Sequence, residues 1–140
     1  MKPAVLFLIV LYCLAAECAF GQNNLHDIRL GNVKNSVTTY RKAGEKEVIT
    51  TYNSILENPR MIYEASACTV THFEITIIPR GADLYGPFNI EGNELPIHII
   101  EYLRKKQDEG KPVKMAIDAF QLSCNGKKEV NNGTLFYVCK

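Results

Sequence analysis

The sequence has few of the residues from which nucleic-acid or membrane-surface sites are usually built. It contains no tryptophan, and its 16 Lys and Arg residues nearly balance its 15 Asp and Glu residues, giving a formal net charge of +1. A chain this close to neutral has no long-range field to attract nucleic acid or an anionic membrane. The basic cluster Arg104-Lys-Lys106 is typical of a solvated helix end. We therefore expect no nucleic-acid partner.

Signature motifs of common enzyme classes are missing as well. There is no Gly-x-Ser-x-Gly elbow, no phosphate loop, no dinucleotide fingerprint and no pair of histidines at zinc-binding spacing. The three histidines, His26, His72 and His98, fall in three different predicted elements. Cys68 and His72 are close in sequence, but four residues along a strand separate them by about 13 Å, too far for a nucleophile and its base. The sequence thus predicts no enzyme, no cofactor and no metal site.

Long apolar runs are limited to one, from Ala4 to Ala16. It follows a short positive start, and Ala19-Phe-Gly21 places small residues at the positions required for cleavage before Gln22. We interpret residues 1–21 as a secretory signal peptide, so the protein is expected to be exported, periplasmic or extracellular, with no stable membrane span after cleavage. Two alternatives remain open. One is a retained signal anchor, although the run is shorter than the roughly 20 residues that span a bilayer.

The other alternative is a lipoprotein in which Cys18 is lipidated. Glu17 stands directly before this cysteine, where a small residue is expected. After cleavage at Gly21 the chain would keep Cys68, Cys124 and Cys139, none of them in a Cys-x-x-Cys motif.

These three cysteines are disulfide candidates. An exported protein meets oxidising conditions, so one disulfide with one cysteine left over is one expectation. Three free thiols, buried as small apolar side chains, is the other. Cys124 and Cys139 lie at opposite ends of a predicted hairpin, which makes their direct bonding the least favoured of the three pairings.

Removal of the signal leaves on the order of 120 residues, which is the size of one domain. Residues 22–54 are interpreted as an N-terminal extension or β-hairpin with a turn at Ala43-Gly-Glu-Lys46. The clearest strand, Val70 to Ile78, alternates apolar with polar residues, which predicts an antiparallel sheet covered on one face only. In the segment that begins at Val113 the alternation changes phase near Asp118 or Ala119, which predicts a bulge.

Two Asn-Gly pairs and one helix complete the pattern. Asn125-Gly126 and Asn132-Gly133 predict hairpin turns. Apolar residues recur at helical spacing from Leu95 to Leu103, with Pro96 in the first turn and Gly110 just past the end. The sequence therefore predicts a mainly β (α+β) fold, a small antiparallel β-sandwich or sheet with one α-helix, about residues 95–109, packed on it.

Several of these segments, in this order, resemble a known domain. They are Phe73-Glu-Ile-Thr-Ile-Ile-Pro79 followed by Arg-Gly, Asn89-Ile-Glu-Gly-Asn-Glu-Leu95, a basic helix ending at Gly110, and Val113-Lys-Met-Ala-Ile-Asp118. The combination resembles the C-terminal domain of GldM, a periplasmic component of the gliding motility and type IX secretion machinery of Bacteroidetes-type bacteria. The resemblance covers roughly residues 55–138, so residues 55–140 are expected to form a GldM C-terminal-like domain. It implies a non-catalytic module that binds a protein partner in the cell envelope.

The connection from Ala82 to Asn93 is the predicted contact region, because long loops often carry function in a small scaffold. An unpaired sheet edge that accepts another strand is the second predicted contact surface. The residues of the candidate interaction loop are Asp83, Leu84, Tyr85, Pro87, Phe88 and Asn89. The alternative hypothesis is a secreted protein that binds a small ligand between helix and sheet. That pocket would be lined by Phe73, Ile75, Ile99 and Leu103.

Overall fold

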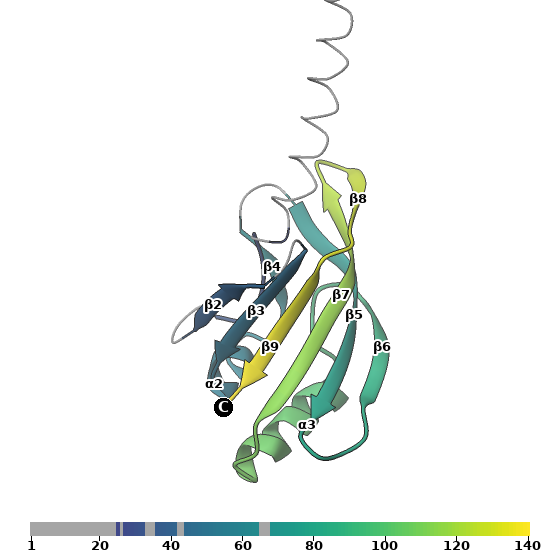
Figure 1. Ribbon diagram of the computed structural model, residues 1–140. Helices are drawn as coiled ribbons and strands as arrows, with labels where there is room; N and C mark the ends of the chain where they lie inside the picture. Colours follow the sequence, from purple (N-terminus) through teal and green to yellow (C-terminus); the bar gives the residue numbers. More distant parts are fainter. Residues whose placement is uncertain (1–24, 26, 33–35, 42–43, 65–67) are drawn as a thin grey trace, which may run out of the picture.

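The computed structural model describes residues 25, 27–32, 36–41, 44–64 and 68–140. The predicted signal peptide, Cys18 and His26 lie outside these residues. The strands are β1 (Ile28–Leu30), β2 (Val37–Tyr40), β3 (Glu45–Thr50), β4 (Met61–Tyr63), β5 (Cys68–Pro79), β6 (Tyr85–Glu91), β7 (Val113–Cys124), β8 (Lys127–Asn131) and β9 (Thr134–Cys139). The helices are α2 (Tyr52–Leu56) and α3 (Ile97–Asp108). The fold is a small α+β fold dominated by an open, twisted sheet (Figure 1).

The main sheet has seven strands in the order β2-β3-β9-β7-β5-β6, with β8 paired to the far part of β7. β2 and β6 lie at its two opposite edges (Figure 1). The predicted β2–β3 hairpin is present, and β3 joins it to the rest of the sheet by pairing with β9. This pair is parallel, so the prediction of a purely antiparallel sheet was wrong in this one place. The pairing joins segments that are far apart in the sequence, and no local sequence pattern predicts such a contact.

One face of the sheet is covered and the other is open. Phe73, Ile75 and Ile77 of β5 have no exposed surface, which confirms the covered face predicted from their alternation. α2, α3 and the small β1–β4 ribbon lie on this covered side (Figure 1). The polar residues that alternate with these apolar residues along β5, such as His72 and Glu74, point to the open side of the sheet and are partly exposed.

The long helix α3 confirms the helix predicted over residues 95–109. It begins after Pro96, packs Ile99 and Leu103 into the core, and ends before Gly110, whose φ of 64° suits glycine. The short helix α2 was not predicted, because the alternation of β3 continues as far as Tyr52 in the sequence. Thr51 ends that strand pattern by accepting the Ser54 N–H with its side chain, which caps the helix.

β7 changes partners halfway along its length. Residues 113–117 pair with β9, whereas residues 120–124 pair with β8. Ala119 lies between the two parts with a φ of 52°, and the β5–β7 register shifts beside it, which confirms the predicted bulge. β8 and β9 both run antiparallel to β7, so the chain continues in one direction through Asn132-Gly133. The hairpin predicted there was wrong. Instead Asn131 accepts the Gly133 N–H at 2.8 Å, which produces a kink without a reversal.

The segment from Ala82 to Asn93 was predicted to be a loop, and this prediction was wrong for most of its residues. Most of it forms the edge strand β6, which pairs with β5 in antiparallel register. The sequence signal was misleading because Gly86 and Pro87 are uncommon inside strands. The structure accommodates them at the edge of the sheet, where the Gly86–Pro87 peptide bond is cis and the β5–β6 register shifts between the Ile75–Phe88 and Ile77–Tyr85 pairs. Only residues 80–84 form the turn between β5 and β6.

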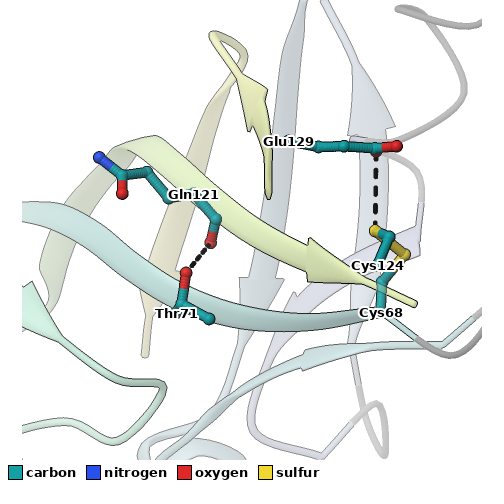
Figure 2. Close-up of a disulfide and its surroundings, with 5 residues drawn as sticks. All are labelled: Cys68, Thr71, Gln121, Cys124 and Glu129. Atoms are coloured by element: carbon teal, nitrogen blue, oxygen red, sulfur yellow. Dashed lines mark hydrogen bonds between the residues drawn. A yellow bond between two sulfur atoms is a disulfide. The ribbon is translucent and has the colours of Figure 1, made fainter. Parts of the chain in front are cut away.

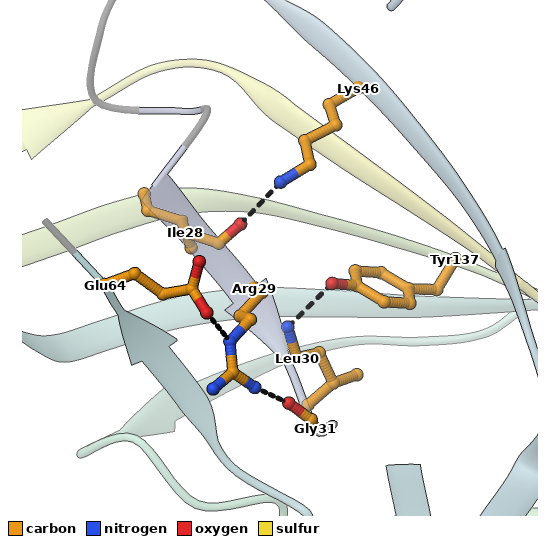
Figure 3. A network of polar contacts seen from close by, with 7 residues as sticks. All are labelled: Ile28, Arg29, Leu30, Gly31, Lys46, Glu64 and Tyr137. Atoms are coloured by element: carbon orange, nitrogen blue, oxygen red, sulfur yellow. Dashed lines mark hydrogen bonds and ion pairs between the residues drawn. The ribbon is translucent and has the colours of Figure 1, made fainter. Parts of the chain in front are cut away.

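Two buried side chains attach the β1–β4 ribbon to the main sheet (Figure 3). Lys46 of β3 donates from Nζ to the Ile28 carbonyl at 3.1 Å. The Tyr137 hydroxyl of β9 accepts the Leu30 N–H at 2.7 Å. Arg29, from the same ribbon, pairs with Glu64. The described residues before position 55 therefore share one core with the strands that follow.

A disulfide joins β5 to β7 at the end of the sheet (Figure 2). Cys68 and Cys124 lie directly opposite each other across the two strands, with their Cα atoms 4.1 Å apart. This is one of the three pairings that the sequence left open, and not the least favoured of them. Cys139 is a free, fully buried thiol in β9. Three residues further along β5, Thr71 donates to the Gln121 carbonyl at 3.2 Å, so the strands stay joined where their register shifts.

Candidate functional site

Aromatic rings from β6 and α3 meet beside the sheet edge. Tyr85 of β6 stacks on Tyr102 of α3, with ring centroids 4.8 Å apart. Phe88 of β6 contacts Tyr85 edge to face at 4.8 Å and His98 of α3 at 5.0 Å. We call these four residues the β6–α3 aromatic cluster. The cis peptide bond at Gly86–Pro87 lies between its two β6 members.

The cluster is only partly covered by the rest of the protein. Tyr85, Phe88 and Tyr102 are half-buried, and His98 is exposed. The residues just before Tyr85 and His98 are Leu84 and Ile97, and each is 64% exposed. These two residues therefore place exposed aliphatic side chains next in sequence to two members of the cluster. The cluster together with Leu84 and Ile97 is called the β6–α3 surface below.

A groove of about 510 Å³ runs beside the free edge of β6. Residues 87–91 of the strand line one side, and Glu94, Leu95, Pro96 and His98 line the other. The helix start thus stands opposite the strand edge and leaves a channel between them. The groove shares Phe88 and His98 with the aromatic cluster, so the two features form one continuous region.

The free edge of β6 carries unpaired backbone groups. Gly92 donates its N–H to the Thr71 carbonyl at 2.7 Å, which marks this pair as hydrogen-bonded across β5 and β6. In an antiparallel ladder the hydrogen-bonded pairs alternate, so the backbone groups of Ile90 and Phe88 also point to β5. Those of Asn89 and Glu91 point away from the sheet, toward the groove.

Carboxylates stand at the rim of the groove. Glu91 and Glu94 have side chains that are 88% and 69% exposed. Glu91 contacts His72 Nδ1 at 3.0 Å, an ion pair only when the imidazole is protonated, and Glu94 contacts Arg60 at 3.1 Å. Because both carboxylates are exposed, each of these pairs contributes little to stability. The rim therefore presents acidic oxygens above an apolar floor.

The candidate interaction residues are divided between the strand and the turn. Tyr85 and Phe88 lie in the aromatic cluster, and Pro87, Phe88 and Asn89 line the groove. Leu84 is exposed at the end of the turn. Asp83 is exposed in the turn and does not line the groove. The structure thus brings most of the predicted residues together, although on a strand and not on a loop.

Sequence reasoning missed the contribution of α3. His98 and Tyr102 are four residues apart, and this spacing places both on one helix face. Two ring-bearing residues on a face that does not carry the core residues Ile99 and Leu103 were the available signal. Their meeting with β6 depends on how the helix crosses the sheet, which the sequence does not show.

The ligand pocket predicted between helix and sheet is not open. Phe73, Ile75, Ile99 and Leu103 all have no exposed surface. They belong to one continuous buried core, so these residues fill the space that a ligand would need. The accessible groove lies outside this core, at the sheet edge.

Three further titratable side chains among the described residues have shifted pKa values outside the groove. Glu74 and Asp118 face each other across β5 and β7, and burial, followed by repulsion from Glu74, raises the pKa of Asp118. Burial raises the pKa of the Cys139 thiol to about 12 and lowers the pKa of Lys46. Within the described ranges, no three His, Cys, Asp or Glu side chains are placed to hold a metal ion.

No helix in the part of the chain that the structure describes is long and apolar enough to cross a membrane. Comparisons of the chain with protein-family models, with curated proteins and with solved structures found no match.

Proposed function

We propose that this protein is an exported, non-catalytic interaction module that resembles the GldM C-terminal domain and binds a protein partner through the β6–α3 surface. The observation that carries the proposal is the meeting of four rings from two elements at the surface, extended by Leu84 and Ile97. Aromatic residues are enriched in protein interfaces, and the residues that dominate binding energy tend to cluster.

Two further features support this proposal. The Cys68–Cys124 disulfide fits an oxidising compartment, as expected for an exported chain. The resemblance to GldM implies a partner in the cell envelope, and makes a component of the gliding motility or type IX secretion machinery the first candidate. Leu95, at the end of the second motif, lines the groove.

A secreted small-ligand-binding protein is the second candidate function. The observation in its favour is the groove of about 510 Å³, which falls in the range of ligand pockets, about 300–1,000 Å³. It ranks second because the groove follows an exposed strand edge, whereas small-molecule sites usually enclose most of the ligand.

Site-specific photo-crosslinking tests the proposal. A photoreactive amino acid replaces Ile97 in one variant and Val130 in the other. Ile97 is 64% exposed on α3, and Val130 is 61% exposed on β8. The two positions therefore lie on different elements but are almost equally accessible. We expect the Ile97 variant to crosslink a defined envelope protein in extracts of the source organism, and the Val130 variant to give no such product.

A matched substitution completes the test. Replacing Phe88 by Ala removes the ring that contacts both Tyr85 and His98, and the Ile97 crosslink should then be lost. Equal crosslinking from both positions, or none from either, would contradict the proposal. A small molecule that co-purifies with the parent protein and not with the Phe88→Ala variant would favour the second candidate.

A further inference from the structure

We propose that the groove beside β6 binds an extended, basic segment of the partner protein, which adds to the sheet as a further strand. This inference rests on the proposed function and specifies the chemistry of the partner. It predicts a main chain paired with the free edge of β6 and Lys or Arg side chains directed to the acidic rim.

The shape of the groove indicates an extended occupant. Its first side consists of consecutive strand residues, 87–91, and not of a patch of side chains from scattered elements. An added strand lies about 4.8 Å from its neighbour and follows it residue by residue, so it would occupy this channel along its length. A helix, at about 10 Å across with its side chains, would contact the strand at fewer points.

Backbone groups on β6 provide the pairing. The N–H and C=O groups of Asn89 and Glu91 point away from β5, as the Thr71–Gly92 hydrogen bond shows. Strand addition gives affinity through such main-chain bonds and specificity through side-chain pockets. Pro87 lacks an N–H, which confines the pairing to the part of the edge from Phe88 onward.

The sheet has two other free strands, and their features argue for β6 as the accepting edge. β8 carries Lys127 and Lys128, and lysines on an edge discourage strand addition. β2 is four residues long and exposed throughout, and the cavity that includes its Thr38 is small, about 90 Å³. The groove beside β6 is larger, about 510 Å³, and has the start of α3 opposite the strand edge.

The acidic residues at the groove indicate that the bound segment is basic. Glu91 and Glu94 stand on the two sides of the groove, one on the strand and one before the helix, and both are largely exposed. Phe88, Leu95 and Pro96 form apolar walls between them. A Lys or Arg side chain matches both features, because its aliphatic stem covers apolar surface while its charged head remains at the carboxylates.

The two carboxylates, Glu91 and Glu94, can each accept a further hydrogen bond from a Lys or Arg head group of the partner. His72 contacts Glu91 and Arg60 contacts Glu94, so each carboxylate has one protein partner. A carboxylate has two oxygens and about four acceptor positions, so each can bind a second donor without losing the first.

Two synthetic peptides test the inference with the folded protein. One contains about nine residues, within the usual length of a strand, with Val and Lys alternating, and the other replaces every Lys by Glu. We expect the Val-Lys peptide to bind at least about tenfold more tightly than the Val-Glu peptide, and its affinity to fall as salt increases. In ¹H–¹⁵N spectra the Asn89 and Glu91 amides should shift, while those of Val37–Tyr40 in the β2 edge remain unchanged.

Charge reversal at the rim provides the sharpest control. In the Glu91→Lys/Glu94→Lys variant, both substitutions are at exposed side chains, so the fold should persist, as its amide spectrum would show. The preference should then invert toward the Val-Glu peptide. N-methylation of alternate peptide amides should abolish binding to the parent protein, because the ladder bonds cannot form.

Equal affinity for the two peptides, binding of neither, or amide shifts confined to β2 or β8 would overturn the inference. Failure here is distinguishable from failure of the proposed function. A partner that crosslinks to Ile97 and requires Phe88, but is not displaced by the Val-Lys peptide, leaves the interaction module intact and removes only the basic, extended occupant.

Discussion

At the scale of single residues, the Tyr137 hydroxyl joins two parts of the fold through one hydrogen bond. It accepts the Leu30 N–H at 2.7 Å and so connects β9 to the β1–β4 ribbon. Burial raises the pKa of Tyr137 to about 12, so the hydroxyl stays protonated in the physiological range. Replacing Tyr137 by Phe leaves the Leu30 N–H without an acceptor in a buried position.

We expect Tyr137→Phe to lower the free energy of unfolding by about 1–3 kcal/mol, the usual cost of an unsatisfied buried group. Urea denaturation measures this change. Val130→Ala, at a site 61% exposed, is the surface control and should change stability by no more than about 0.5 kcal/mol. Equal stability of the Tyr137→Phe variant and the parent would show that the Leu30 bond contributes nothing.

Asp118 is the residue from which a pH dependence follows. Burial and, secondly, Glu74 raise its pKa above the ordinary value, so the folded state binds its proton more tightly than the unfolded state. Stability attributable to Asp118 is therefore highest in acid and falls as pH rises from the ordinary carboxyl pKa through the raised one. At neutral pH the ionised carboxylate is destabilising.

Asp118→Asn should accordingly stabilise the protein at pH 7, by a few tenths to about 1 kcal/mol, the range for like charges directly opposite across strands. The gain should shrink as pH is lowered through the carboxyl range, and Glu74→Gln should act in the same direction. Chemical denaturation at a series of pH values checks this. A gain that is independent of pH would assign the effect to something other than charge.

At the scale of elements, β5 and β7 form the centre of the structure, and the disulfide fixes one end of the pair. Cys68 and Cys124 are 56 residues apart in sequence, so the bond closes a long loop. In the chain-entropy account a loop of this length stabilises a protein by about 4 kcal/mol. Replacing both cysteines by Ser should thus lower the free energy of unfolding by about 2–4 kcal/mol, as measured by denaturation without reductant.

Thiol labelling supplies the independent readout for that variant. In the mature chain expected after cleavage, the parent should label slowly at Cys139 when folded, because that thiol is fully buried and its pKa is raised to about 12. Denaturation without reductant should expose one thiol, and denaturation with reductant should expose Cys68 and Cys124 as well. Rapid labelling of the folded parent at Cys68 or Cys124 would refute the disulfide.

The elements differ in how far the sequence predicts them. Val70 to Ile78 and the helix near Leu95–Leu103 are visible because a regular apolar period runs through each. β6 was not recognised because Gly86 and Pro87 are usual in loops, and only the unpaired edge allows them in a strand. The parallel β3–β9 pair and the meeting of β6 with α3 depend on contacts between distant segments, which leave no local pattern.

At the scale of the whole molecule, α3 carries both core residues and the exposed residues to which we propose a binding role. Leu103 has no exposed surface and packs into the core, whereas Ile97 on the same helix is 64% exposed. Leu103→Ala should lower the free energy of unfolding by about 2–5 kcal/mol through lost burial and the resulting cavity. Ile97→Ala should leave stability within about 0.5 kcal/mol and weaken capture of the envelope partner.

Thermal or urea denaturation and quantitative pull-down, applied to both variants, test this division. The covered face of the sheet contributes the buried core, and our proposal assigns binding to the β6 edge with the outer side of α3. An Ile97→Ala variant that unfolds easily, or that binds its partner as well as the parent does, would show that the two roles are not separated in this way.

The position of β9 sets the order in which this molecule can fold. Residues 134–139 follow all the other described strands in the sequence, yet they lie between β3 and β7, inside the sheet. Until they arrive, the β2–β3 hairpin has no neighbour to join, and contacts over such separations form slowly. We expect the sheet to stay incomplete until residues 134–139 have been synthesised. In the exported protein that we propose, this delay would keep the chain in the unfolded form in which it can be threaded across a membrane.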